Sequence, residues 1–263
     1  MLFRSLIIRL SSIGDIVLTT PVIRCLKQQV PDAEVHVLTK ASFRSVLQHN
    51  PYIDRLHLWD KSYLLLIDQL RQLEFDEVID LHHNTKTLRI KQALGVKAHS
   101  FYKLNIEKYL LTAFKVNVLP DKHIVDRYLD TVSHLGVRND GKGLDYFLSD
   151  SDKLSKQDIP GAQWGGFVAV VIGAALGTKR WPTEHFKKLC QELEHPIVLL
   201  GGKEDRERGE MIAASDPIKI YNACGKFTLN ESADWVRRSK FVITGDTGLM
   251  HIAAAFKKPI ISL

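Results

Sequence analysis

The sequence predicts an α/β protein whose strands form parallel sheets in two successive domains. Short β-branched or apolar runs alternate with amphipathic segments, a pattern typical of βαβ units and of a parallel sheet. The alternation pauses at residues 149–166, which are rich in Ser, Asp, Lys, Gly and Pro, and then starts again. The length of 263 residues also exceeds that of one typical domain. We therefore expect one domain at residues 1–155 and a second at residues 156–263.

The first half contains five expected strands, each a short and mostly apolar run. They are Leu6–Leu10, Val35–Leu38, Arg55–Leu58, Glu77–Leu81 and Lys97–Phe101. Apolar residues at helical spacing lie between and after them. This spacing predicts helices at Ile16–Gln29, Leu64–Leu73 and Thr85–Ala93, and a longer one at Asp121–Leu135 that Gly136 closes.

The second half repeats the alternation. Strands are expected at Phe167–Ile172, Ile197–Leu200, Ile218–Tyr221, Phe241–Thr244 and Pro259–Leu263. Helices are expected at Pro182–Leu193, Glu204–Ala214, Leu229–Ser239 and Thr247–Phe256. Because the sequence stops inside the last of these strands, we expect the C-terminal domain to be truncated.

Composition narrows the class of protein and its surroundings. The chain is 45% hydrophobic and 25% charged, which is ordinary for a globular protein. Its net charge of +6 would favour binding to an anionic substrate or an anionic membrane surface. The same charge is equally expected of a basic protein that has no special partner. Three cysteines without CxxC spacing favour a reducing compartment over disulfides or a zinc site. No apolar run approaches the roughly 18 residues of a spanning helix. We expect a cytoplasmic protein, with peripheral membrane contact allowed and no nucleic-acid partner.

The first candidate site is the loop after the first strand, where Ser11, Ser12 and Gly14 precede Asp15. Loops at the carboxyl ends of parallel strands are where such sheets bind ligands. Asp15 is either a functional carboxylate there or only an N-cap for the helix that follows. The GxGxxG fingerprint of dinucleotide-binding folds is absent from this loop.

Two loops of the second half carry features suited to a nucleotide. Lys179 and Arg180 lie in a glycine-containing loop before a helix, and such a loop is suited to bind a diphosphate. An exposed basic loop without a ligand would show the same sequence pattern. Asp205 follows a strand and two glycines, where an acidic side chain can accept hydrogen bonds from ribose hydroxyls. Equally, it would complement the dipole of the next helix.

The turn after the strand Phe241–Thr244 has the form of an anion site. Asp246 lies at the strand exit, Thr247 is placed to cap the next helix, and Gly248 permits close approach to the backbone. His251 lies four residues beyond Thr247, on the same helical face. Walker A, HExxH, EF-hand and GxSxG motifs are absent, which excludes several large classes of enzyme.

A basic segment in the first half is a candidate for an anionic partner. Lys86 and Arg89 follow the fourth expected strand and enter the next helix. They are suited to an anionic acceptor, although a solvated cationic helix face would show the same pattern.

Taken together, these segments resemble the ADP-heptose:lipopolysaccharide heptosyltransferases of glycosyltransferase family 9. Ser11-Ser-Ile-Gly-Asp15 is similar to the S-S-x-G-D segment of that family, and Lys179-Arg-Trp-Pro182 to its K-x-W-P segment. Gly245-Asp-Thr-Gly-Leu-Met-His251 is similar to its D-T-G-L-x-H segment, and the three segments follow the same order.

The resemblance implies a GT-B fold, in which two Rossmann-like domains face each other across a cleft. It implies an inverting, metal-independent transfer of heptose from ADP-heptose to a lipid-linked anionic saccharide of the lipopolysaccharide inner core, at the cytoplasmic face of the inner membrane. Asp15 would be the catalytic base, and Lys179 would neutralise the leaving diphosphate. The residues thereby assigned to the donor are Thr178, Lys179, Asp205, Phe227, Asp246, Thr247, Gly248 and His251; those assigned to the acceptor are Ser11, Ser12, Gly14, Lys86 and Arg89.

One departure from the family pattern keeps alternatives open. Ala174 and Ala175 stand where members of the family often place threonine hydroxyls on the phosphates, and Thr178 is the residue that would compensate. The alternatives are a transferase that uses another sugar nucleotide and a non-catalytic protein that binds nucleotide sugars. A Rossmann oxidoreductase is a third, and the missing GxGxxG counts against it.

Overall fold

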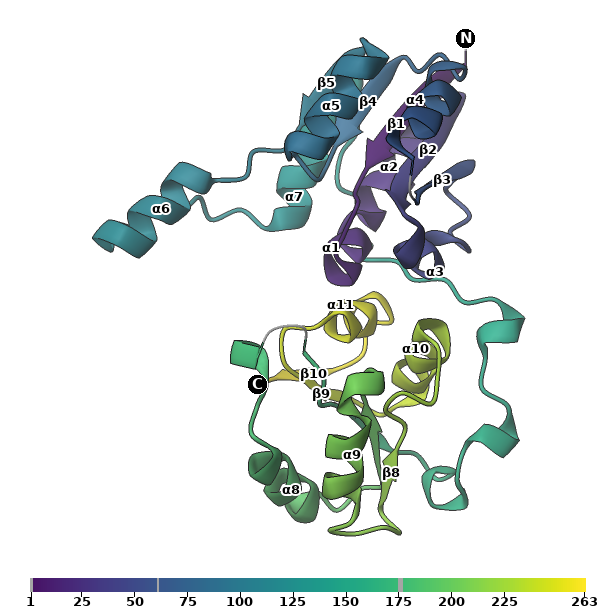
Figure 1. Ribbon diagram of the computed structural model, residues 1–263, viewed down its shortest axis with the longest axis vertical. Helices are drawn as coiled ribbons and strands as arrows, with labels where there is room; N and C mark the ends of the chain where they lie inside the picture. The colour runs from purple at the N-terminus through teal and green to yellow at the C-terminus, as the bar shows by residue number, and fades with distance from the viewer. Residues whose placement is uncertain (1, 61, 175–176) are drawn as a thin grey trace. The chain divides into compact units, whose positions relative to one another are not determined.

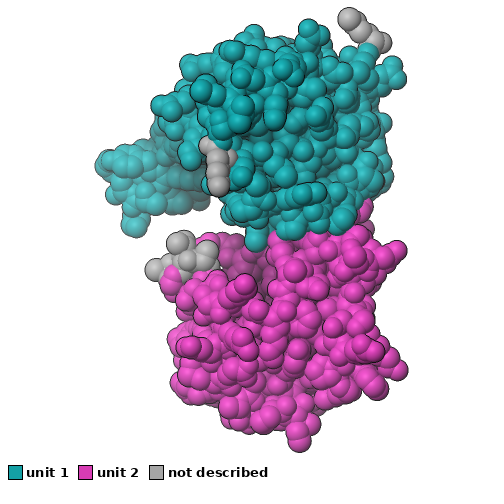
Figure 2. All heavy atoms as spheres, turned by 45° about the vertical axis from the view of Figure 1, so that its right-hand side comes forward, with its two compact units in different colours: residues 1–142 teal, residues 143–263 magenta. Residues whose placement is uncertain are grey.

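The strands of this chain assemble into two separate parallel sheets. A computed structural model describes residues 2–60, 62–174 and 177–263. It divides into unit 1, Met1–Lys142, and unit 2, Gly143–Leu263, which Figures 1 and 2 distinguish. Each unit has its own five-stranded sheet. The expected α/β class with two Rossmann-like parallel sheets is confirmed.

Unit 1 has the strand order β3-β2-β1-β4-β5, and every neighbouring pair is parallel. The strands are β1 (Phe3–Ile8), β2 (Ala33–Lys40), β3 (Arg55–Trp59), β4 (Glu77–Asp80) and β5 (Lys97–Ser100). The helices are α1 (Ile13–Val17), α2 (Thr20–Gln29), α3 (Arg44–Leu47), α4 (Tyr63–Arg71), α5 (Thr85–Leu94), α6 (Asn105–Phe114) and α7 (Ile124–Leu129).

Side chains of β1 point alternately to the two faces of the first sheet, and helices cover both faces. Leu6 and Ile8 point to one face, where they pack with Leu66 and Leu70 of α4 and Ile90 of α5. The residue between them, Ile7, is also fully buried, because α2 and α7 pack together on the opposite side. A strand buried on both faces reads as a continuous apolar run, which is why the sequence signalled it clearly.

Unit 2 has the order β10-β9-β6-β7-β8, again parallel throughout. The strands are β6 (Val168–Val171), β7 (Ile197–Leu200), β8 (Ile220–Asn222), β9 (Val242–Thr244) and β10 (Ile260–Ser262). The helices are α8 (Thr183–Glu192), α9 (Arg206–Ala213), α10 (Leu229–Arg238) and α11 (Gly248–Ala255).

Alternation along β6 builds two cores in unit 2. Val168 and Val170 face Phe186 of α8 and the helix α9, whereas Ala169 and Val171 face α10 and α11. Trp235 of α10 is fully buried in this second core. The small Ala169 leaves room for that indole at the centre of the sheet.

The segment after Lys142 belongs to unit 2 by its contacts, although the sequence placed the domain boundary at residue 155. The Tyr146 hydroxyl donates to Asn230 Oδ1 at 2.6 Å, and the Leu154 N–H donates to Asp234 Oδ2 at 2.8 Å. Both acceptors lie on α10. Residues 143–155 therefore pack on the second sheet before the polar linker gives way to β6.

Two expected helices differ in detail from the structure. The segment expected at Ile16–Gln29 forms α1 and α2, because Pro21 has no N–H for an uninterrupted helix. The Val17 carbonyl instead accepts a hydrogen bond from the Thr20 hydroxyl at 2.7 Å. The segment expected at Asp121–Leu135 becomes helical only at Ile124 and continues as a 3-10 helix over Asp130–Leu135. Gly136 closes it with a φ of 80°, as expected.

None of the described helices is both long enough and apolar enough to cross a membrane.

Candidate functional site

Each sheet reverses its strand order beside its first strand, and the candidate residues gather there. In unit 1, β2 lies on one side of β1 and β4 on the other. In unit 2, β7 and β9 flank β6 in the same way. Loops diverge at such a switch point and leave a crevice at the carboxyl ends of the strands, which is where open α/β sheets bind ligands.

The loop after β1 holds Asp15 at the switch point of unit 1. Asp15 is in the first turn of α1, and its Oδ2 accepts hydrogen bonds from the Ser12 N–H at 3.1 Å and the Ser12 hydroxyl at 3.0 Å. The same oxygen lies 2.7 Å from an Arg9 guanidinium nitrogen. The side chain is still 40% exposed, so a carboxylate held on three sides remains open to solvent.

Arg9 is the residue that fixes this carboxylate, and sequence reasoning did not single it out. Its side chain is buried, donates to the carbonyl oxygens of Ser11 at 2.7 Å and Leu81 at 2.5 Å, and also donates to the Tyr128 hydroxyl at 2.9 Å. Burial raises the pKa of Asp15, but the charge of Arg9 and the hydrogen bonds from Ser12 and Arg9 outweigh it and lower the pKa below the usual 3.8. Asp15 is therefore ionised at neutral pH.

His82 is a second group at this switch point that the motif search did not select. It follows β4, and burial together with the charges of Arg9 and Lys103 lowers its pKa to about 4. Its Nδ1 is buried and has no hydrogen-bond partner among the described residues. A neutral imidazole thus lies in the electrostatic field of Asp15. Only the return of β4 beside β1 brings the two together, and no local pattern signals that pairing.

The basic segment on α5 borders a cavity at the carboxyl ends of β2 and β3. The cavity measures about 350 Å³, and its lining residues are Lys40, Ala41, Ser42, Trp59, Asp60 and Lys86. The Lys86 ammonium lies 5.8 Å from the centre of the Trp59 ring. Arg89 is exposed one turn further along α5. An aromatic ring with two lysines beside it is suited to a charged saccharide.

In unit 2, two loops from neighbouring strands meet through an ion pair. The loop after β6 supplies Lys179, whose ammonium contacts Asp246 from the turn after β9. His251 of α11 lies with its Nε2 3.8 Å from the other Asp246 oxygen. Thr247 caps α11 by accepting a hydrogen bond from the Met250 N–H at 3.3 Å. The structure thus brings together Lys179, Asp246, Thr247, Gly248 and His251.

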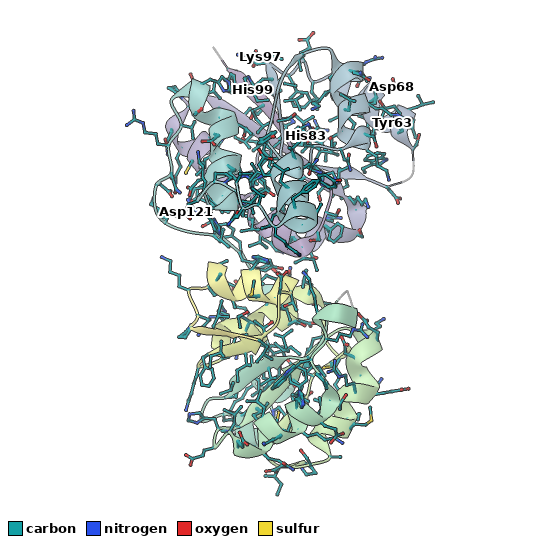
Figure 3. The ribbon with its side chains drawn as sticks, turned by 90° about the vertical axis from the view of Figure 1, so that its left-hand side faces the viewer. Tyr63, Asp68, His83, Lys97, His99 and Asp121 are labelled. Atoms are coloured by element: carbon teal, nitrogen blue, oxygen red, sulfur yellow. The ribbon has the colours of Figure 1, made fainter. Side chains whose placement is uncertain are left out.

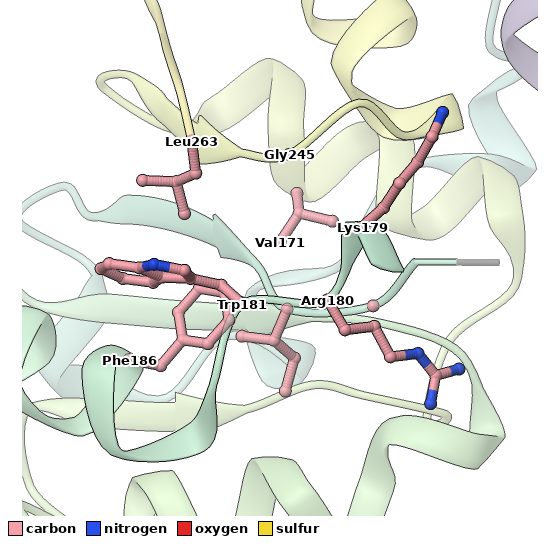
Figure 4. Close-up of a pocket in the computed structure, with 9 residues that line it drawn as sticks. Val171, Lys179, Arg180, Trp181, Phe186, Gly245 and Leu263 are labelled. Atoms are coloured by element: carbon pink, nitrogen blue, oxygen red, sulfur yellow. The ribbon is translucent and has the colours of Figure 1, made fainter. Parts of the chain in front are cut away.

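A pocket of about 210 Å³ lies beside this ion pair and is shown in Figure 4. Lys179 and Arg180 line one side, with Gly245 above and Trp181 and Phe186 forming an apolar floor. The N–H groups of a first helical turn have no partner within the helix. Together with the lysine they make the entrance of α11 suited to a phosphate.

Arg208 of α9 holds the loop that carries Lys179. Its guanidinium donates to the carbonyl oxygens of Ile172 at 3.0 Å and of Trp181, and its Nε donates to the Thr183 hydroxyl at 3.1 Å. These bonds tie both ends of the loop to the body of unit 2. Arg208 has no motif of its own, so sequence alone did not reveal it.

The remaining predicted donor residues lie as follows. Asp205 is only 2% exposed, and its Oδ2 accepts a hydrogen bond from the Gly202 N–H at 2.9 Å. A Cβ on Gly173 would overlap that oxygen, so Asp205 and the glycine loop pack directly together. Phe227 is half-buried against Trp235, with ring centres 5.6 Å apart. Ala175 lies outside the described residues, and so does the side chain of Thr178.

One cluster of described side chains, away from both switch points, offers potential metal ligands. It consists of Glu77, His99 and His134, whose ligand atoms lie within 4.8 Å of one another. Figure 3 labels His99, which lies on the edge strand β5 together with Lys97. The imidazoles of His99 and His134 are stacked, with centres 3.8 Å apart and planes at 15°. His134 Nε2 is hydrogen-bonded to Oε2 of the buried Glu77 at 2.9 Å, and His99 Nε2 lies 3.8 Å from the same oxygen.

These features define a class of protein. Two Rossmann-like units carry a poised carboxylate in the first and a cationic, helix-capped anion pocket in the second. This combination suits group transfer from a phosphate-bearing donor.

Comparison with known proteins gives the family. The model of glycosyltransferase family 9 (heptosyltransferase) matches residues 63–263. Lipooligosaccharide heptosyltransferase 2 of Haemophilus influenzae is 27% identical over 299 residues, which cover 98% of this chain and 82% of the relative. Lipopolysaccharide heptosyltransferase 2 of Escherichia coli K12 is 25% identical, with 98% and 81% covered. The chain belongs to glycosyltransferase family 9 and is a glycosyltransferase of the heptosyltransferase type.

Solved structures agree on the fold. A family 9 glycosyl transferase from Veillonella parvula has a TM-score of 0.80 at 24% identity, with 99% of this chain and 80% of that chain covered. The ADP-heptose heptosyltransferase II of E. coli has a TM-score of 0.77 at 22% identity, with 99% and 84% covered. The resemblance inferred from the three sequence motifs is confirmed, and the oxidoreductase alternative is wrong.

Proposed function

We propose that this enzyme transfers heptose from ADP-heptose to a lipopolysaccharide inner-core acceptor, with inversion at the anomeric carbon and without a metal ion. The observation that carries the proposal is that the same chain holds a hydrogen-bonded, ionised Asp15 in unit 1 and the pocket lined by Lys179 in unit 2. The family match supports glycosyl transfer, and the relatives named above are heptosyltransferases of lipopolysaccharide or lipooligosaccharide.

The donor half of the proposal rests on unit 2. A sugar diphosphate carries its charge beside the bond that breaks, so cations and N–H donors must receive the electrons that leave with it. Lys179 and the entrance of α11 offer both, and the ion pair with Asp246 holds the ammonium beside the turn that leads into α11. A related solved structure, E. coli heptosyltransferase WaaC, is in complex with an ADP-heptose analogue, which supports an ADP-linked donor.

The acceptor half rests on unit 1. The oxygen of the acceptor hydroxyl attacks the anomeric carbon on the face opposite the diphosphate. Asp15 takes the proton of that hydroxyl as the new bond forms. The bond from that carbon to the diphosphate oxygen breaks, and its electron pair leaves on ADP, so the configuration inverts. Ser11, Ser12 and Gly14 shape this loop, and Lys86 and Arg89 are suited to the negative charges of the acceptor.

The test of the base is Asp15→Asn, which keeps the shape of the side chain and removes its charge. Turnover should fall by about 100-fold to 10,000-fold, the usual contribution of a general base. The affinity for ADP measured by calorimetry should stay the same, because unit 2 holds the nucleotide pocket.

Asp54→Asn is the matched control, since Asp54 is another partly exposed carboxylate of unit 1, ion-paired with Lys27 at 2.7 Å. Undiminished turnover in Asp15→Asn would remove Asp15 as the base. Tight ADP binding in the wild type without product from any core acceptor would instead favour a non-catalytic nucleotide-sugar-binding protein.

A further inference from the structure

The helix α6 has an apolar face that the rest of unit 1 leaves uncovered. Each of the other ten-residue helices in the described chain, α2, α5, α8 and α10, buries at least two of its residues, whereas α6 buries none. In Figure 1 it projects away from the sheet of unit 1 on the chain segment that joins β5 to α7. A helix of this length is marginal in water without packing, so its exposed face calls for a partner.

The exposed apolar side chains of the described chain are concentrated on this segment. Six of the fifteen large ones fall within residues 102–118, namely Tyr102, Ile106, Tyr109, Phe114, Val116 and Val118. Ile106 is 66% exposed, and Tyr109 and Phe114 are each 62% exposed. The rings of these last two contact edge to face, with centres 6.0 Å apart.

The spacing of these residues gives α6 two distinct faces. Ile106, Tyr109, Leu110, Ala113 and Phe114 follow the i, i+3, i+4, i+7, i+8 pattern of one apolar stripe. The opposite side carries Asn105, Lys108 and Thr112 together with Leu111, and Lys115 follows as the C-cap of the helix. Neither lysine has an ion-pair partner in the described chain, so both charges face solvent. Glu107 is the acidic residue of the helix, and the Tyr102 hydroxyl donates to it at 3.3 Å.

We propose that the apolar face of α6 docks this enzyme on an anionic lipid bilayer, with Lys108 and Lys115 attracted to the headgroups. An aromatic and aliphatic stripe opposite unpaired lysines is the composition of a helix that lies in the plane of a membrane interface. Tyr109 suits that position because its ring is apolar and its hydroxyl reaches water. The two lysines and the net charge of +6 match the negative charge of an anionic lipid surface, which argues for lipid as the occupant of this face.

The inference stands on the helix alone and needs neither Asp15 nor Lys179. Its test uses the full chain with vesicles of phosphatidylglycerol and phosphatidylethanolamine, and with phosphatidylcholine vesicles for comparison. Co-sedimentation should show binding to the anionic vesicles that weakens with added salt. Tyr109→Ser/Phe114→Ser should reduce the bound fraction, and Lys108→Glu/Lys115→Glu should weaken binding by at least about tenfold.

Matched controls come from exposed side chains elsewhere. Leu64→Ser/Leu65→Ser removes two exposed leucines of α4, and Lys188→Glu reverses an exposed lysine of α8; both should bind vesicles as the wild type does. Transfer to a detergent-free, delipidated acceptor should be equal in all the folded variants, so failure of docking and failure of catalysis are distinguishable. Vesicle binding unchanged by either α6 variant would overturn the proposal. So would a dimer that Tyr109→Ser/Phe114→Ser dissociates in the absence of lipid.

Discussion

At the scale of single residues, the state of Asp15 depends on Arg9. Burial alone would make this carboxylate harder to ionise, and the guanidinium 2.7 Å away reverses that effect. A base of low pKa accepts a proton only when the attacking hydroxyl has become acidic, that is, late in bond formation. In the proposed role of Asp15 as base, Arg9 keeps the carboxylate ionised at neutral pH and lowers the driving force for proton transfer to it.

Arg9→Gln should move the acid limb of the pH–rate profile toward neutral pH. Without the guanidinium charge, burial dominates and the pKa of Asp15 rises, so the protonated and inactive fraction grows on the acid side. The profile of kcat/KM between pH 4 and 8 measures this shift. Arg4→Gln, which breaks a surface pair with Glu34 at 2.7 Å, should leave the profile unchanged. Superimposable profiles for Arg9→Gln and the wild type would show that Arg9 does not tune the base.

Lys179→Met should slow transfer by about 100-fold to 1,000-fold, the range seen when one group that stabilises developing charge is removed. The methionine keeps the apolar stem that lines the pocket and removes the ammonium that pairs with Asp246. Steady-state kinetics measures the loss, and calorimetry with ADP should show weaker binding. Lys187→Met is the control, because Lys187 pairs with Glu184 at 2.8 Å on the outside of α8. Wild-type rates in Lys179→Met would exclude the lysine from the donor site.

Part of this site could be predicted from sequence, and the division has a physical cause. Asp15, Lys179 and Asp246 each lie in a loop after a strand, so local pattern and the rule of strand ends suffice to find them. His82, Lys103 and Arg208 act through neighbours distant in sequence, and nothing in their own segments signals it.

At the scale of elements, strands were predicted more accurately than helices. Ile197–Leu200 was predicted exactly, because a strand buried on both faces is an unbroken apolar run bounded by polar turns. The helix α6 was not predicted, although Ile106, Tyr109 and Phe114 have helical spacing. The short α3 was also missed, since four residues carry too little periodicity to be recognised.

Several contacts hold the end of unit 1 to α2, and the most buried side chain among them is Arg24, which pairs with Asp140. Arg24 Nε and a terminal nitrogen each lie 2.8 Å from the carboxylate, and Arg24 is only 1% exposed. Hydrogen bonds from Arg24 lower the pKa of Asp140 to about 2. Because this pKa is depressed from 3.8, the stabilisation is complete above about pH 4 and is lost as the pH falls toward 2.

Asp140→Ala should therefore lower the free energy of unfolding by about 3 kcal/mol at pH 7, because it leaves a buried guanidinium without its carboxylate. The difference from the wild type should shrink as the pH approaches 2. Urea unfolding followed by circular dichroism measures both effects. Asp150→Ala removes a fully solvated carboxylate and should leave the stability close to that of the wild type. A pH-independent difference between Asp140→Ala and the wild type would show that the ion pair is not its cause.

At the scale of the whole molecule, the chain forms two units with separate hydrophobic cores. Unit 1 has its core between β1 and the helices α4 and α5, and unit 2 has cores on both faces of β6. The candidate base lies in the first unit and the candidate nucleotide pocket in the second. A chain built in this way need not unfold in one cooperative step.

Calorimetric melting of the full chain can separate the unfolding of the two units, because ADP should affect unit 2 and Asp140→Ala should affect unit 1. ADP at 100 times its Kd should stabilise unit 2 by about 2.7 kcal/mol and raise its transition. Asp140→Ala should lower the transition of unit 1 and leave the ADP-dependent one in place. UDP and GDP, which share the diphosphate, should give smaller shifts if the pocket recognises adenine. If ADP raises the same melting transition that Asp140→Ala lowers, the two units melt together. If ADP, UDP and GDP raise the transition equally, Lys179 and its pocket recognise the diphosphate and not the base.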